Sequence, residues 1–119
     1  MSELNIKLDS DTNIFAPGQT VEANISWLLD EQPEKLSLAL HWHTQSRAGE
    51  ESGMADCLEI EGPGRSGSHD FAFQIPSGPY SFKGRLLSIE WVLELAALPG
   101  IDLARQPIIV SPTATTIKP

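Results

Sequence analysis

Residues 20–29 read Thr-Val-Glu-Ala-Asn-Ile-Ser-Trp-Leu-Leu, and this stretch does most to decide the fold class. Polar and apolar side chains alternate along it, with Leu28 as the exception. Successive side chains of a β-strand point to opposite faces, so a period of two gives one apolar and one polar face. The stretch therefore predicts a strand with one face in the core. Its apolar positions are Val21, Ala23, Ile25, Trp27 and Leu29.

The same alternation marks several other short runs. Residues 35–44 repeat it after a polar connection, and two such runs joined through a turn are typical of an antiparallel pair, so we expect 20–29 and 35–44 to pair. Residues 45–53 and 62–68 are small and polar without periodicity, so we expect exposed loops there. Further short strands are expected around Leu4 to Leu8, Leu58 to Ile60, Phe71 to Ile75 and Ile108 to Val110.

The stretch from Phe82 to Leu98 fits two interpretations. Some of its apolar residues follow the spacing of a helical stripe, whereas Leu87 to Leu95 alternate with mostly polar residues as a strand would. A helix would place Leu87 and Trp91 on or near its wet side, so we favour a strand.

The number and spacing of these runs indicate the fold class. About seven or eight short strands with frequent turn signals and no convincing long helix are typical of an antiparallel β-sandwich. A chain of 119 residues has room for one domain of this kind. We expect the domain to span residues 1–112 and residues 113–119 to form a frayed tail.

Composition narrows the classes of partner and compartment. The net charge of −8 disfavours binding to nucleic acid and to anionic membrane surfaces. No run approaches a membrane span, and the N-terminus lacks the apolar stretch of a signal peptide. Cys57, the single cysteine, cannot close an intrachain disulfide and is expected to be small and half-buried. We therefore expect a cytoplasmic protein.

Three segments together resemble the arrestin-like superfamily. Phe15 to Val21 resembles its proline-glycine turn before a strand, and Leu36 to Thr44 resembles the next strand. Phe71 to Pro76, Gly78 to Gly84 and Leu87 to Leu93 resemble its aromatic strand, short crossover and long following strand.

The resemblance implies an immunoglobulin-like β-sandwich and a non-enzymatic adaptor or scaffold function. Arrestins carry two tandem sandwiches, whereas this chain supplies one, so features that lie between two domains are not carried over. The resemblance also supplies no catalytic residue, and we expect no enzyme activity and no cofactor.

Two motifs have the composition of a chemical site without its context. Residues 62–67 fit the pattern G-x-G-x-x-G, but a strand and not a helix N-terminus is expected to follow. Ser66, Ser68, His69 and Asp70 include the residue types of a nucleophilic triad, but neighbours on a strand point to opposite faces. We expect no nucleotide site and no hydrolytic site.

The spacing of His41 and His43 along the sequence suits a pair of metal ligands. Two residues apart on a strand, their imidazoles project from the same face, as zinc or iron ligands do. A third ligand would have to come from another strand, with His69 among the candidates. A small metal-dependent or ligand-binding β protein using His41, His43 and His69 is therefore the alternative function; we expect no metal.

The preferred function is a protein-interaction module. Leu86 and Val92 are expected on the outer side of the long strand, facing away from Leu87, Trp91 and Leu93. With His41 and His43 as neighbours they would form an apolar contact patch. We expect this patch to bind a protein partner, a second copy of the chain among the possibilities.

Overall fold

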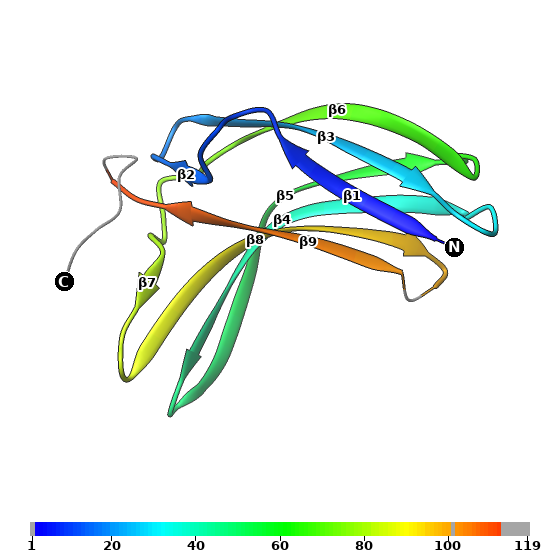
Figure 1. Cartoon of the computed structure of the whole chain (residues 1–119). Helices are drawn as coiled ribbons and strands as arrows, with labels where there is room; N and C mark the ends of the chain where they lie inside the picture. Colours follow the sequence, from blue (N-terminus) through cyan, green and yellow to red (C-terminus); the bar gives the residue numbers. More distant parts are fainter. Residues whose placement is uncertain (1, 101, 113–119) are drawn as a thin grey trace.

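The computed structural model describes residues 2–100 and 102–112, and within these the regular elements are all strands (Figure 1). The predicted all-β class is therefore confirmed. The predicted frayed tail, residues 113–119, lies outside the described residues. In chain order the strands are β1 (Glu3–Leu8), β2 (Ile14–Phe15), β3 (Thr20–Leu28), β4 (Lys35–Ser46), β5 (Gly49–Glu61), β6 (Ser66–Gln74), β7 (Phe82–Lys83), β8 (Leu87–Leu98) and β9 (Leu103–Val110).

The strands form two layers. One sheet has the order β1-β3-β6, and the other has the order β2-β9-β8-β4-β5, with β7 paired to β8 (Figure 1). The short pair β2 and β9 is parallel, and the other pairs are antiparallel. The two sheets face each other across the core, which confirms the predicted β-sandwich.

The core lies between the alternating inner faces of the two sheets. Leu36, Leu38 and Leu40 on β4 are at most 1% exposed, as are Trp91 and Leu93 on β8. Full burial of such a side chain is worth about 1.5–3 kcal/mol. The three-stranded sheet covers them with Val21, Ala23, Ile25, Trp27, Phe71 and Phe73.

The predicted pairing of residues 20–29 with 35–44 is wrong. β3 pairs with β1 and β6, whereas β4 pairs with β5 and β8. The connection passes from one sheet to the other: the Leu29 amide donates to the Arg65 carbonyl, and the Glu34 amide donates to the Leu98 carbonyl. Each run has a single apolar face, and crossing between sheets lets these faces cover each other.

The predicted loop at residues 45–53 is also wrong. β4 continues to Ser46 and β5 begins at Gly49, so the segment is a hairpin with Arg47 and Ala48 at its tip. Gly49 has a φ of 130°, a backbone conformation that favours glycine. Most of the residues in this hairpin are exposed, so no apolar alternation marked its strands. The other predicted loop, 62–68, ends early because β6 begins at Ser66.

The strand interpretation of the Phe82 to Leu98 stretch is correct for β8, Leu87–Leu98. Phe82 and Lys83 form the separate strand β7, and Arg85 and Leu86 form the tip of the β7–β8 hairpin.

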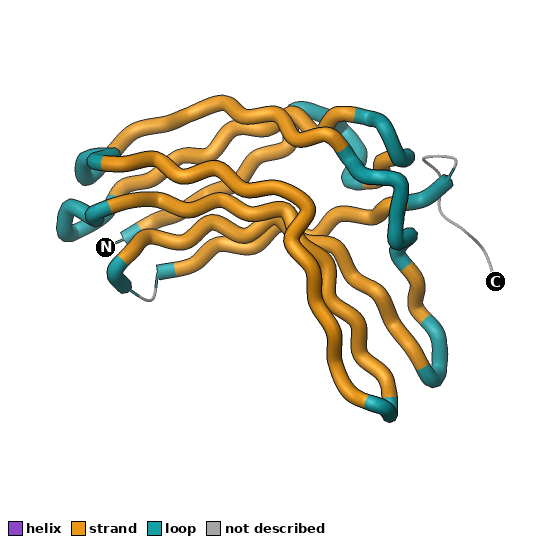
Figure 2. The backbone as a smooth tube through the Cα atoms, turned by 180° about the vertical axis from the view of Figure 1, so that it is seen from behind, coloured by secondary structure: helices purple, strands orange, loops and turns teal. Residues whose placement is uncertain are grey.

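Two hairpins extend beyond the sandwich as an arm, which we define as residues 41–54 and 82–90. A bulge between Leu40 and His41 in the pairing of β4 with β5 marks the point where the arm leaves the body of the sheet. Figures 1 and 2 show the arm projecting at a steep angle, on the side away from β1, β3 and β6. The arm positions the candidate site.

Candidate functional site

The six-stranded sheet splits where the arm begins. β9 runs beside β8 only as far as the pair of Trp91 with Ile108. Further along β8, toward its N-terminal end, β7 pairs with the same edge, and Phe82 lies opposite Ile89. Between these pairs, Glu90 has no strand partner on that side among the described residues. This fork encloses a hollow of about 800 Å³, which we call the fork hollow.

The lining of the fork hollow is largely apolar because side chains from both faces of β8 reach it at the fork. Trp91 is 1% exposed and belongs to the core, whereas Val92 points to the outer face and is still only 7% exposed. Phe82 is 54% exposed. An apolar concavity with a few polar groups is the usual form of a binding site. The apolar lining includes Phe82, Trp91, Val92, Pro107, Ile108 and Ile109.

Hydrogen bonds fix residues 79–81, the segment before β7 at one wall of the fork hollow. The Trp91 indole Nε1 donates to the Pro79 carbonyl at 2.8 Å. The Ser81 amide donates to the Val110 carbonyl at 2.8 Å, and the Val110 amide donates to the Ser81 hydroxyl at 2.9 Å. These bonds tie residues 79–81 to both β8 and β9, so the wall is fixed before any ligand arrives.

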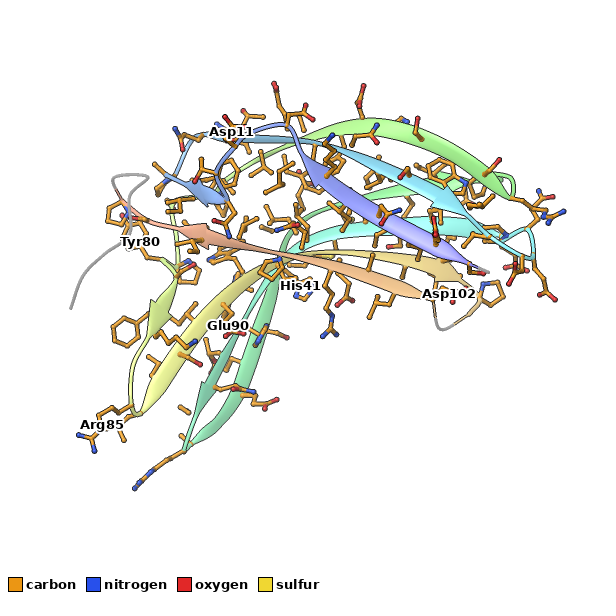
Figure 3. All side chains as sticks on the ribbon, viewed as in Figure 1. Asp11, His41, Tyr80, Arg85, Glu90 and Asp102 are labelled. Atoms are coloured by element: carbon orange, nitrogen blue, oxygen red, sulfur yellow. The ribbon has the colours of Figure 1, made fainter. Side chains whose placement is uncertain are left out.

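Three charge contacts lie on the outer face beside the fork hollow. His43 Nε2 is 3.1 Å from Glu90 Oε2, and His41 Nε2 is 3.6 Å from Glu94 Oε2. Arg105 Nε donates to the same Glu94 oxygen at 2.8 Å. Figure 3 labels His41 and Glu90 near the corner between the arm and the sandwich. All these side chains are partly exposed, so the contacts orient the side chains more than they stabilise the fold.

Phe82 and Lys83 form the side of the fork hollow that belongs to the arm. A Cβ built on Gly84 would lie 2.6 Å from Phe82 Cε1, so the ring rests over the glycine of the following turn. Lys83 pairs with Ser88 across the hairpin and lines the hollow. No ion pair found among the described residues includes Lys83.

The structure brings three of the four predicted interaction residues together. His41, His43 and Val92 all line the fork hollow, and His41 is opposite Val92 on the neighbouring strand. Leu86 is 66% exposed at the hairpin tip and lies against a separate shallow depression together with Arg47. Leu86 and Val92 are six positions apart, about 20 Å in an extended chain, so the two do not form one patch.

The alternative three-histidine metal site is not assembled. His69 lies on β6 opposite Ile25, in the three-stranded sheet, whereas His41 and His43 lie on the outer face of the other sheet. Across residues 2–100 and 102–112 no group of three or more His, Cys, Asp and Glu is arranged to hold a metal ion.

The other motifs take up ordinary positions in the fold. Gly62 and Gly64 have positive φ values of 58° and 78° in a turn that leads into a strand. The Asp70 carboxylate accepts from Asn24 Nδ2 at 2.9 Å across the β3–β6 pair. Cys57 was expected to be half-buried and is exposed instead, because β5 is an edge strand.

Sequence reasoning did not select the side chains of Phe82, Lys83 and Pro107 for a site, and the structure places all three in the lining of the fork hollow. Their importance depends on where β9 leaves β8, and no local pattern reports the end of a pairing. Only the structure shows that four large apolar side chains of residues 80–87 are left exposed. These are Tyr80, Phe82, Leu86 and Leu87, between 38% and 66% exposed.

Comparison with known proteins supports the fold. The crystal structure of the sporulation control protein Spo0M from Bacillus subtilis matches with a TM-score of 0.64 and 17% sequence identity. The match covers 92% of this chain and 49% of Spo0M, so the chain spans about half of that protein. At this identity the match shows a shared fold alone, and it supports the predicted β-sandwich.

Other comparisons add no family. A β-glucosidase from Listeria innocua matches 92% of this chain and 16% of its own at 12% identity, with a TM-score of 0.48 that carries no argument. No protein-family model matches the chain, and no curated protein matches it. In the part of the chain that the structure describes, no helix is long and apolar enough to cross a membrane.

Proposed function

We propose that this chain is a non-enzymatic protein-interaction domain that binds an apolar segment of a partner protein in the fork hollow. The observation that carries the proposal is Phe82, a large aromatic side chain left 54% exposed at a preformed apolar concavity. Aromatic anchors beside such concavities contribute much of the free energy of protein association. The name of Spo0M, a sporulation control protein, fits a regulatory binding role for this type of sandwich.

The geometry of the fork hollow suits recognition better than catalysis. Its histidines each face a glutamate, and the neighbouring wall is fixed by the bonds of Trp91 and Ser81. A fixed wall lowers the entropic cost of binding, because fewer groups must be ordered when the partner arrives.

We also propose a cytoplasmic location, since the exposed thiol of Cys57 has no partner within the chain.

Photocrosslinking tests the proposal with a matched control position. Phe82 and Leu28 are both 54% exposed, but Leu28 lies at the end of β3 in the other sheet. A photoreactive phenylalanine analogue is placed at one position or the other, and the protein is irradiated in native extract. We expect the probe at position 82 to crosslink one dominant protein. The probe at position 28 should not crosslink that protein.

Affinity measurements complete the test once that partner is identified. Phe82→Ser should weaken binding about five- to thirtyfold, which corresponds to about 1–2 kcal/mol of lost apolar burial. Leu28→Ser should leave binding unchanged. Equal crosslinking from both positions, or equal effects of the two substitutions, would contradict a binding role of the fork hollow.

A further inference from the structure

The charges around the fork hollow differ from those of the chain as a whole. The sequence contains 16 Asp and Glu against 8 Lys and Arg. The lining of the hollow has two cationic side chains, Lys83 and Arg105, against one carboxylate, Glu90, and the Glu94 carboxylate lies beside it, 2.8 Å from Arg105. An acidic protein therefore has an apolar concavity that is not itself acidic.

The carboxylates nearest the fork hollow already have partners. Glu90 is 3.1 Å from His43, and Glu94 accepts from Arg105 at 2.8 Å. A cation that entered the hollow would compete with these contacts. Lys83, by contrast, takes part in none of the ion pairs found in the described part of the chain. Arg105 uses one of its five N–H donors on Glu94, so it also retains donors for an anion.

The two cations differ in position. Lys83 lies across from Ser88, and Arg105 lies across from Glu94. Ser88 and Glu94 are six positions apart on β8, about 20 Å along the strand. Lys83 is therefore the cation on the arm side, next to Phe82 and the mouth of the fork hollow. Phe82 and Lys83 are strand neighbours that point to opposite faces, but both line the fork hollow, so one ligand in the hollow can contact both.

From this charge pattern we infer that the partner segment is both apolar and acidic, with a carboxylate directly beside the apolar side chains that enter the fork hollow. Lys83 pairs with that carboxylate, while Phe82 and Val92 contact the apolar part. This inference rests on the proposed function and specifies the chemistry of its ligand. The positive charge of Lys83 at the hollow lets an acidic segment bind to a chain whose net charge is negative.

Three blocked peptides of one length provide the probe. N-acetylated, C-amidated Phe-Leu-Phe-Glu, Phe-Leu-Phe-Gln and Phe-Leu-Phe-Lys differ only in the last residue, which is acidic, neutral or basic. Binding is followed by the indole N–H resonance of Trp91, whose Nε1 lies in the wall of the fork hollow. Because Lys83 is exposed, we expect the Glu peptide to bind about two- to fivefold more tightly than the Gln peptide, and the Lys peptide to bind most weakly.

A matched pair of lysine variants assigns the preference to one residue. Lys83→Gln should abolish the difference between the Glu and Gln peptides. Lys7→Gln removes the same charge from an exposed position on β1 in the other sheet and should preserve the difference.

Two outcomes would overturn the inference. If all three peptides bind equally and Phe82→Ser weakens them equally, the fork hollow binds apolar segments without a charge preference, and the proposed function stands alone. If the Glu peptide fails to shift the Trp91 resonance at any concentration, the acidic ligand is excluded; the crosslinking at position 82 then decides separately whether the hollow binds a protein at all.

Discussion

The indole ring of Trp42 covers Gly53, the residue directly opposite it in the β4–β5 pair. A Cβ built on Gly53 would lie 2.7 Å from both Cε2 and Cζ2 of Trp42, closer than real Cβ atoms approach a neighbour. Trp27 rests over Gly67 in the same way, and Phe82 rests over Gly84. Aromatic rings that cover glycines on a neighbouring strand compensate for the apolar contact that glycine cannot supply.

Gly53→Ala should therefore destabilise the fold by about 1–3 kcal/mol, because the new methyl group must displace a packed indole at the base of the arm. Chemical denaturation measures the loss, and tryptophan fluorescence reports the movement of the ring. Ser52→Ala, a substitution at the neighbouring exposed residue, is the control and should change stability little. A Gly53→Ala protein as stable as this control would contradict the packing described above.

We predict that replacement by phenylalanine lowers the free energy of unfolding by different amounts at Trp27 and at Trp91. Trp91 Nε1 donates to the Pro79 carbonyl, whereas Trp27 Nε1 is buried without a hydrogen-bond partner in the described structure. Both tryptophans lose the same atoms on replacement by phenylalanine, but only Trp91→Phe also breaks a hydrogen bond. Trp91→Phe should therefore cost about 0.5–1.5 kcal/mol more than Trp27→Phe.

Urea unfolding of the two variants measures this difference directly, and unchanged m-values would show that both remain two-state. A Trp27→Phe protein that is the less stable of the two would show that the Trp91 bond adds nothing to stability.

Self-association is a third expectation, and of the two residues predicted for it only Leu86 lies on an open surface. Val92 is 7% exposed and lies within the fork hollow, whereas Leu86 and its neighbour Leu87 are 66% and 38% exposed beside the arm tip. If two copies associate through the arm, Leu86→Glu should shift sedimentation velocity profiles at micromolar concentration toward the monomer. Leu28→Glu on the other sheet should leave the profiles as in the wild type. A wild type that remains monomeric throughout the concentration range would exclude the arm as a homodimer contact.

Metal content provides a fourth test. His41 and His43 each face a glutamate, and His69 lies in the other sheet, so no third ligand completes a site within residues 2–100 and 102–112. Protein purified without a histidine tag should therefore contain far less than one equivalent of zinc, iron or copper. Stoichiometric metal that is lost in His41→Ala would restore the metal-dependent alternative.

Alternation predicted those strands that have one face in the core. β3, the first half of β4 and the end of β8 each bury one face, so burial alternates along them and their sequences largely follow a period of two. The arm part of β5 has no such signal, because nearly all its residues from Gly49 to Asp56 are exposed. The sequence also could not predict which strands pair. A strand with one apolar face can lie beside another such strand in the same sheet, or it can face that strand from the opposite sheet.

The candidate site was predictable only in part, for a related physical reason. The spacing of His41 and His43 placed them correctly on one face beside Val92. The fork hollow itself arises where β9 turns away toward β2, and this depends on contacts such as the Ile109 amide donating to the Asn13 carbonyl. Such long-range contacts leave no trace in the local pattern around Phe82 or Lys83.

Because of where β9 ends, the two ends of the described chain are not equally suitable for attaching a tag or a surface. Ser111 is 1% exposed, lines the fork hollow and donates its amide to the Phe15 carbonyl at 2.9 Å. The described chain therefore leaves the fold from the wall of the hollow, whereas β1 begins at the far end of the sandwich (Figure 1). An affinity tag, fluorophore or surface linkage attached after residue 112 would crowd the entrance that the binding assays measure. Immobilisation through the N-terminal side keeps that entrance clear.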